Sequence, residues 1–148
     1  MSESETHPQN LSTSADRALF SGQVRGFAVI LHRNERPLSG LAGLLDWRFQ
    51  GAVSSYVRNG AISGELGQCA YLPLTRKGVT YHLLFIGAGD CVAPGKRVPP
   101  PTEALAVMRK NILGLRLEKI GLSRSDLGGV SDEFLVKHLE GIPLWIVQ

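Results

Sequence analysis

The chain has 148 residues, 43% hydrophobic and 20% charged, which is the balance of one soluble globular domain and excludes a disordered or fibrous chain. Its two cysteines, Cys69 and Cys91, exclude a disulfide framework and favour a reducing compartment. The formal net charge is +3, and three of the 13 acids (Glu3, Glu5 and Asp16) precede the first base, so the remainder carries 16 bases against 10 acids. These bases are scattered, and no nucleic-acid-binding motif is present, so nucleic acid is an unlikely partner.

Residues 1–20 are mostly polar and acidic, with few apolar anchors, and are expected to form a disordered tail. Residues 21–148 are expected to form a single domain. The acidic start does not match a signal peptide, and no run reaches the roughly 18–20 apolar residues of a membrane span. We therefore expect a cytoplasmic protein that does not contact a membrane.

Short apolar runs predict four strands. Their cores are continuous rather than alternating, which is typical of strands buried on both faces of a sheet. The runs are Gly26–Leu31, Ala70–Leu74, Tyr81–Ile86 and Leu144–Val147. Since Pro73 cannot donate a ladder hydrogen bond, its strand is expected to end there or to lie at an edge.

Helical patterns lie between these runs. Ser39 is a candidate cap for a helix over residues 40–46, and a second helical pattern covers residues 47–58. Thr102 is a candidate cap for the longest helix, residues 103–119, and Ser131 opens a last short helix that Gly141 ends. Strands and helices in this order predict a three-layer α/β/α sandwich with a mixed sheet, in which the second and third runs pair as an antiparallel hairpin.

Three phrases carry a resemblance to a known family. They are NGAISGELGQ (residues 59–68), HLLFIGAGD (82–90) and EALAVMRKNILGLRLEK (103–119), following the first strand GFAVIL. In this order they resemble the amino-terminal domain of the leucyl aminopeptidases, over about residues 24–148. The resemblance implies a macro-domain-like fold; macro domains bind ADP-ribose in many other proteins.

The chemistry of that family belongs to its second domain, and the chain stops at Gln148, about where that domain would begin. The family's Asn-Thr-Asp-Ala-Glu-Gly-Arg phrase, which helps to hold two metal ions, does not occur in the sequence. The carboxylates are dispersed, and neither the histidines nor the cysteines have zinc-ligand spacing. We therefore expect no metal, no cofactor and no enzymatic activity.

One segment is a candidate ligand site: Gly87, Ala88, Gly89 and Asp90, together with Lys96 and Arg97. It follows a buried strand, where backbone amides can meet an anion. A lone Gly-x-Gly is a weak signal, since the third glycine of the dinucleotide fingerprint is missing, and a tight turn is the favoured interpretation. A reactive thiol at Cys91 would need a base or a positive environment nearby.

These observations favour a non-catalytic interaction or regulatory module, with an unidentified protein partner or self-association. Two alternatives stay open. One is a small-molecule binder of the macro-domain type, for ADP-ribose or a nucleotide. The other is a subunit completed by a separate metallopeptidase chain.

Overall fold

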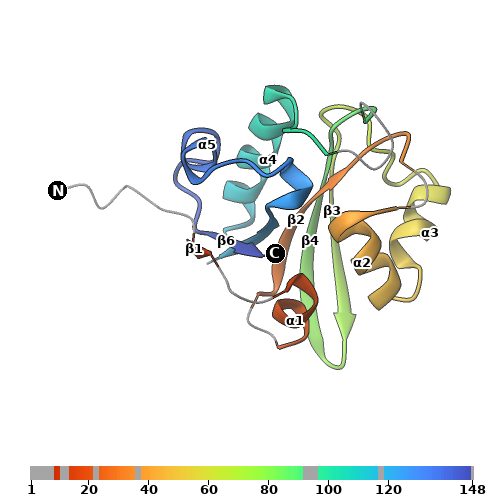
Figure 1. Ribbon diagram of the computed structural model, residues 1–148. Helices are drawn as coiled ribbons and strands as arrows, with labels where there is room; N and C mark the ends of the chain where they lie inside the picture. The colour runs from red at the N-terminus through yellow and green to blue at the C-terminus, as the bar shows by residue number, and fades with distance from the viewer. Residues whose placement is uncertain are drawn as a thin grey trace.

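A six-stranded mixed sheet forms the centre of the molecule, in the order β1-β6-β5-β2-β4-β3 (Figure 1). The computed structural model describes residues 9–10, 14–21, 24–35, 38–91, 97–116 and 119–147. Its strands are β1 (Gln9–Asn10), β2 (Gly26–Leu31), β3 (Cys69–Arg76), β4 (Val79–Gly87), β5 (Ile120–Ser123) and β6 (Leu144–Val147). Only the β3–β4 pair is antiparallel, and the other pairs are parallel.

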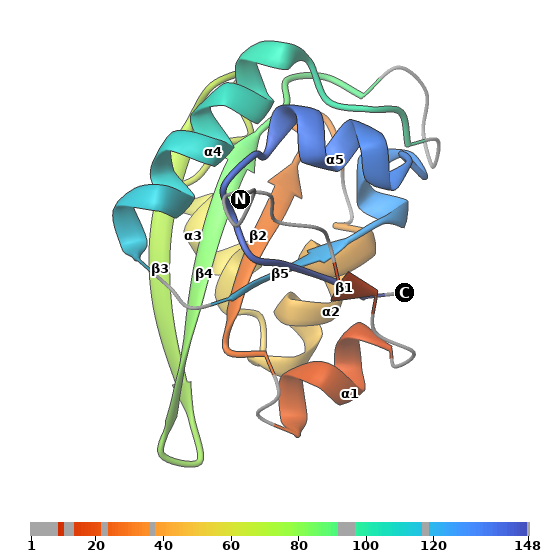
Figure 2. The same ribbon diagram turned by 90° about the vertical axis from the view of Figure 1, so that its left-hand side faces the viewer.

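Helices cover both faces of this sheet, so the predicted three-layer α/β/α architecture is confirmed. They are α1 (Ala15–Phe20), α2 (Gly40–Arg48), α3 (Ala52–Arg58), α4 (Thr102–Leu115) and α5 (Asp132–His138), with a 3₁₀ turn, η1, at Ser125–Leu127. Figure 2 looks onto the sheet with α4 and α5 in front of it and α2 and α3 behind it. Among the described residues, no helix is both long enough and apolar enough to cross a membrane.

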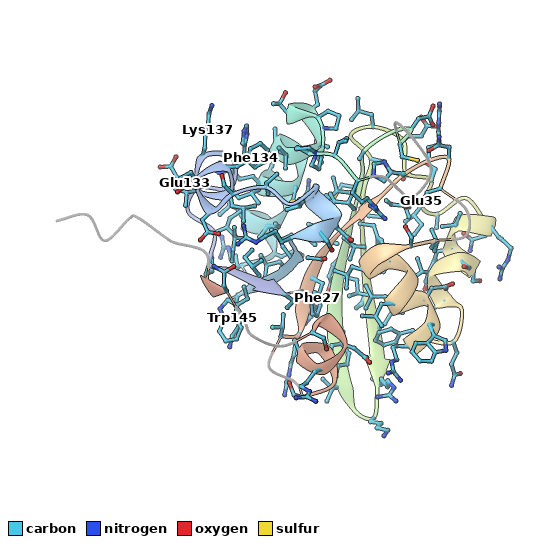
Figure 3. The ribbon with its side chains drawn as sticks, in the orientation of Figure 1. Phe27, Glu35, Glu133, Phe134, Lys137 and Trp145 are labelled. Carbon is cyan, nitrogen blue, oxygen red and sulfur yellow. The ribbon has the colours of Figure 1, made fainter. Side chains whose placement is uncertain are left out.

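Strand β2 is buried along its whole length, as its continuous apolar run predicts. Because successive side chains of a strand point to opposite faces, Phe27 and Val29 pack in the core beneath α2 and α3, whereas Ala28 and Ile30 pack in the core beneath α4. Phe27 is labelled on this central strand in Figure 3.

The antiparallel hairpin is also confirmed. Strands β3 and β4 pair from Cys69 with Ile86 to Arg76 with Val79, around a turn at Lys77 and Gly78 in the left-handed region. Strand β3 is the last strand of the sheet, so Pro73 lies in an edge strand as predicted.

The helix predicted over residues 47–58 is longer than the helix observed there. Residues 47–48 belong to the end of α2, and α3 starts only at Ala52. Between them Gln50 and Gly51 adopt positive φ angles of 57° and 82°, which breaks the helical path. The two helices are held together by Asp46, whose carboxylate accepts hydrogen bonds from the Ser54 backbone N–H and hydroxyl.

The helix caps agree with the sequence in part. Ser131 caps α5 as predicted, because its hydroxyl accepts a hydrogen bond from the Phe134 N–H at 3.2 Å, although the helix ends at His138 rather than at Gly141. Thr102 is the first residue of α4 and not its cap. The helix ends at Leu115, earlier than the predicted residue 119, because Arg116 follows it in a left-handed conformation.

Two strands and two helical elements were not predicted, and the 3₁₀ turn η1 is one of them. Strand β5 has four residues, of which Gly121 and Ser123 are not apolar, so it gives little hydrophobic signal. Strand β1 and helix α1 lie within the segment for which the sequence predicts disorder. There β1 pairs with β6, Ala18 is fully buried, and Asp16 forms an ion pair with Arg48. The domain boundary near residue 21 stays a prediction.

The connections define a topological switch point between β2 and β5. From β2 the chain passes through α2 and α3 on one face to β3 at the far edge, whereas from β5 it passes through η1 and α5 on the other face to β6 (Figure 2). Neighbouring strands whose connections leave to opposite faces open a crevice at their carboxyl ends, and open α/β sheets bind ligands there.

Candidate functional site

The buried polar residues of the described chain gather at this switch point. Three polar side chains are buried there: His32 directly after β2, Ser123 at the end of β5, and Asp126 in η1, with exposed fractions of 5%, 7% and 4%. Burying a polar side chain costs free energy unless the side chain is paired. Three buried polar side chains in one place therefore mark a candidate site. We call these three residues, together with Glu35, Ser39 and Arg97, the switch-point cluster.

Asp126 places a carboxylate at the first turn of α2. It accepts a hydrogen bond from the Leu41 N–H at 3.1 Å, where an anion is favoured by the helix dipole. A side chain on Gly40 would collide with this carboxylate, since an added Cβ would lie 2.2 Å from its Oδ1. Burial raises the pKa of Asp126, whereas the Leu41 N–H and the charge of Arg97 act in the opposite direction.

Arg97 spans the space between β2 and α2. Its Nη2 donates to the Glu35 carboxylate at 2.7 Å and to the Ser39 hydroxyl at 3.0 Å. The side chains of Arg97 and Glu35 are only 13% and 11% exposed, so this ion pair is largely removed from water. Figure 3 shows Glu35 between the carboxyl end of β2 and α2. Arg97 Nη1 is buried and has no hydrogen-bond partner among the described residues.

Ser39 therefore serves the cluster rather than the helix. It occupies the N-cap position of α2 as predicted, but its side chain makes no capping bond to the helix. Asp126 supplies the acceptor for the helix N-terminus instead. The local sequence identified the helix start correctly, but the group that satisfies it comes from a distant loop.

The Gly87–Asp90 segment packs tightly against the protein's own backbone. The N–H groups of Gly87, Ala88 and Gly89 donate to the carbonyls of Gln68, Leu31 and Gly64 respectively. A Cβ on Gly87 would lie 1.9 Å from the Glu65 carbonyl oxygen. These three amides are thus engaged by the protein, and Gly87 allows two loops to approach closely.

Asp90 closes the turn by pairing with Arg33 across the ends of β4 and β2. Arg33 donates two hydrogen bonds to the carboxylate, at 2.9 and 2.7 Å, and contacts Glu65 as well. The hydrogen bond from Arg33 lowers the pKa of Asp90. Both side chains are about half exposed, which makes this a surface brace at the mouth of the site.

A small pocket of about 100 Å³ lies beside this brace. Its lining includes His32, Ala88, Asp90 and Cys91, and residues 98–101 complete it. The Nδ1 atom of His32 is 3.2 Å from the Gly89 carbonyl oxygen, which holds the imidazole against the turn. The pocket places Cys91 and His32 in one lining, a proximity that sequence spacing did not predict.

The predicted site residues therefore fall into two groups on either side of His32. Ala88 and Asp90 line the small pocket, Gly87 and Gly89 bond to the backbone of residues 64–68, and Arg97 lies in the switch-point cluster. Lys96 is outside the described residues.

Sequence reasoning missed the rest of the cluster. His32 and Glu35 directly follow a buried strand, and this position was a usable signal. Asp126 had no such signal, because the strand before it was not predicted.

Within the described part of the chain, no three His, Cys, Asp or Glu side chains converge as metal ligands would. Burial raises the pKa of the Cys69 thiol, which makes it a poor nucleophile.

No protein-family model and no curated protein matches the sequence. Solved structures do match. The macrodomain of Mycobacterium tuberculosis DarG matches with a TM-score of 0.64 at 13% identity, over 96% of this chain and 97% of that one. The macrodomain of Thermus aquaticus DarG matches with a TM-score of 0.63 at 14% identity, over 95% and 97%.

The chain has a macrodomain-like fold. A mutant of tomato leucine aminopeptidase also matches, with a TM-score of 0.55 at 14% identity, over 96% of this chain and 32% of that enzyme. The resemblance drawn from the sequence is thus confirmed at the level of the fold, and this chain spans about a third of that enzyme's length. At these identities the likeness establishes the fold and leaves the function to the site.

Proposed function

We propose that the protein is a binding module for a phosphorylated ribose ligand of the ADP-ribose class, held at the switch-point cluster. The observation that carries the proposal is the gathering of His32, Ser123 and Asp126 in the crevice between β2 and β5. This is where open α/β sheets take their ligands, and the macrodomain-like fold supports the assignment.

The chemistry of the cluster favours a ligand that both donates and accepts hydrogen bonds. Arg97 Nη1 is a buried cationic donor that suits a phosphate oxygen. Glu35 and Asp126 are acceptors that suit ribose hydroxyls. A bare phosphate would meet two carboxylates beside one guanidinium, so inorganic phosphate is a poorer match than a sugar phosphate.

The proposal is tested by thermal unfolding with ADP-ribose, AMP, ribose 5-phosphate and inorganic phosphate. A ligand at 100 times its Kd adds about 2.7 kcal/mol to stability, roughly 5–10 °C for a domain of this size. We expect a saturable rise with ADP-ribose and none with inorganic phosphate. No rise with any sugar phosphate would contradict the proposal.

Two variants locate the binding. Arg97→Met removes the free donor and should weaken binding at least about tenfold, as expected for a charged hydrogen bond. Lys137→Met, which changes an exposed residue of α5, is the control. Affinity is measured by calorimetric titration at temperatures below those at which the protein unfolds. Only variants whose circular dichroism matches that of the wild type are compared, so that a loss of affinity is not confused with a loss of stability. Equal affinity of Arg97→Met and wild type would place the ligand elsewhere.

A protein-interaction role, which the sequence favoured, is supported by a different observation. Trp47 is 70% exposed on the outer side of α2, far more than a large apolar side chain requires. The two roles use different parts of the surface and do not exclude each other.

A further inference from the structure

A tyrosine and a histidine meet on the β3–β4 hairpin, at the edge of the sheet and away from the switch-point cluster. The hydroxyl oxygen of Tyr71 lies 2.5 Å from Nδ1 of His82. Their rings are stacked, with centroids 5.9 Å apart and planes at 9° to each other. We call these two residues the Tyr71–His82 pair.

The sheet fixes the position of both residues. Tyr71 is paired with Leu84 and His82 with Pro73, so Tyr71 and His82 are diagonal neighbours on one face of the hairpin. This is the face of Leu84, which packs in the core beneath α4. The backbone N–H of His82 donates to the Arg25 carbonyl at 2.7 Å, so the chain entering β2 holds His82 from the other side. The imidazole therefore stands on a strand that is paired along both edges.

Tyr71 is the accessible tyrosine of the chain. The sequence has three tyrosines, and all of them lie in described segments. Tyr81 is only 3% exposed, and Tyr56 packs against the same core, whereas Tyr71 is 41% exposed. Figure 2 shows α4 in front of one part of the hairpin only, with the turn end extending beyond the helix. A reagent in solution therefore reaches the Tyr71 hydroxyl more readily than the other two.

The pair has the geometry of a nucleophile beside its base. A phenol is almost wholly protonated at neutral pH and is a weak nucleophile while it keeps its proton. A base within hydrogen-bond reach can take this proton as the new bond forms, and imidazole is the side chain that exchanges protons near neutral pH. Neutral His82 with its proton on Nε2 presents Nδ1 as the acceptor for the Tyr71 hydroxyl.

The charges of the surrounding elements decide which reagents are compatible with the pair. The hairpin, residues 69–87, contains no Asp or Glu and carries Arg76 and Lys77 next to its turn. The single acid of α4, which contacts both strands, is Glu103 in the first turn of that helix. An anionic reagent therefore meets no carboxylate of the hairpin itself.

We propose that the Tyr71–His82 pair is an acyl-acceptor site, at which Tyr71 is modified by a small acyl phosphate. The Tyr71 hydroxyl oxygen attacks the carbonyl carbon, so that a new C–O bond forms and the bond between this carbon and the phosphate oxygen breaks. Phosphate leaves with the electron pair of that bond. The phenol proton passes to Nδ1 of His82 and from there to the released phosphate. The products are a tyrosyl ester and inorganic phosphate, and the step does not involve the ligand proposed for the switch-point cluster.

The test incubates the full chain with acetyl phosphate and measures acetylation of each tyrosine by peptide mass spectrometry. N-acetyltyrosinamide in the same solution serves as the reference for an unassisted phenol. We expect Tyr71 to be acetylated about a hundredfold faster than this reference, since a positioned base contributes that much or more. Tyr56 and Tyr81 should stay unmodified.

Variants whose circular dichroism matches the wild type identify the base. His82→Gln keeps a side chain that can accept a hydrogen bond from Tyr71 but cannot take up its proton, and should react at about the rate of the reference. His138→Gln is the matched control and should have no effect, because this imidazole lies on α5 against Phe134. Tyr71→Phe should remove the acetylated peptide.

The dependence of the rate on pH separates a base from a structural support. In the wild type the rate should rise while His82 loses its proton and then level off. In His82→Gln it should rise about tenfold per pH unit, as for a phenol that reacts only after ionising. If His82 only supported the hairpin, its replacement would lower the rate by the same factor at every pH.

Three results would overturn the inference. The first is acetylation of Tyr71 no faster than that of N-acetyltyrosinamide. The second is an equal rate in wild type and His82→Gln, which would reduce the contact to a cross-strand pair that stabilises the hairpin. The third is transfer of the phosphoryl group rather than the acetyl group to Tyr71 or His82, which would make the site a phosphoryl acceptor.

Discussion

Asp126 is buried with a charge that its surroundings only partly compensate. Burial raises its pKa above the ordinary value of 3.8, so the folded chain holds the proton more tightly than the unfolded chain does. The free energy of unfolding must therefore fall as pH rises from near 3.8 through the raised pKa. Ionised Asp126 opposes folding above this window.

The variant Asp126→Asn should reveal this cost. Asparagine keeps an oxygen that can accept from the Leu41 N–H but cannot ionise. The stability of Asp126→Asn relative to wild type should therefore rise with pH across the window, by about 1.4 kcal/mol for each unit of pKa shift. Urea denaturation at a series of pH values measures it.

Asp90 provides a control of opposite sign. Because Arg33 lowers the pKa of Asp90, the ionised carboxylate favours the folded state, and this contribution is lost as pH falls through the window below 3.8. The relative stability of Asp90→Asn should then fall with rising pH. Parallel pH profiles for the two variants would show that Asp126 is not penalised by burial.

At the scale of elements, the end of β4 depends on the loop that crosses it. Gly87 donates to the Gln68 carbonyl and accepts from the Gly67 N–H, while the Glu65 carbonyl occupies the place of a side chain. Gly87→Ala must push one backbone segment away from the other. We expect it to lower the free energy of unfolding by about 1–3 kcal/mol.

Gly114 is the matched control, since an added Cβ there meets no atom and the residue lies within α4. Gly114→Ala should raise stability by roughly 0.5–1 kcal/mol through helix propensity. Equal effects of the two substitutions in urea denaturation would mean that the contact at Gly87 is relaxed at little cost.

Elements with their own local signal were predicted well from the sequence. The apolar runs of β2 and β6 match the observed strands residue for residue, and Ser131 identified its helix start. Local signals fail where distant groups decide the structure. Strand β5 is specified by its pairing with β2 and β6 rather than by its own short run, and the cap of α2 comes from Asp126. The switch-point cluster depends on the position of β5 and on the contact between Asp126 and α2. Arg97 is therefore the one member of the cluster that was predicted as a site residue from the sequence.

At the scale of the whole molecule, the amino-terminal segment covers one edge of the sheet. β1 pairs with β6, the Asp16 carboxylate pairs with Arg48 on α2, and Ala18 is fully buried. Removing residues 1–21 should cost about 1–3 kcal/mol through these lost contacts and leave β6 as an unpaired edge prone to association.

Calorimetry together with light scattering on two truncations checks this expectation. Removal of residues 1–8, which precede β1, should leave the unfolding temperature unchanged. Removal of residues 1–21 should lower it and increase scattering. Unchanged unfolding after the longer deletion would mean that β1 and α1 contribute nothing to the fold.

The central strand imposes an order on folding. β2 lies near the beginning of the chain, yet Phe27 pairs with Gly121, and β5 in turn pairs with β6 at residues 144–147. During synthesis β2 can first join the β3–β4 hairpin, but its other side stays open until the last strands have emerged. Long-range parallel pairing of this kind forms slowly, because the intervening chain must be closed into a loop before any contact offsets that loss of entropy. The nascent chain therefore carries an exposed apolar strand edge for most of its synthesis, which is the stage at which chaperones act.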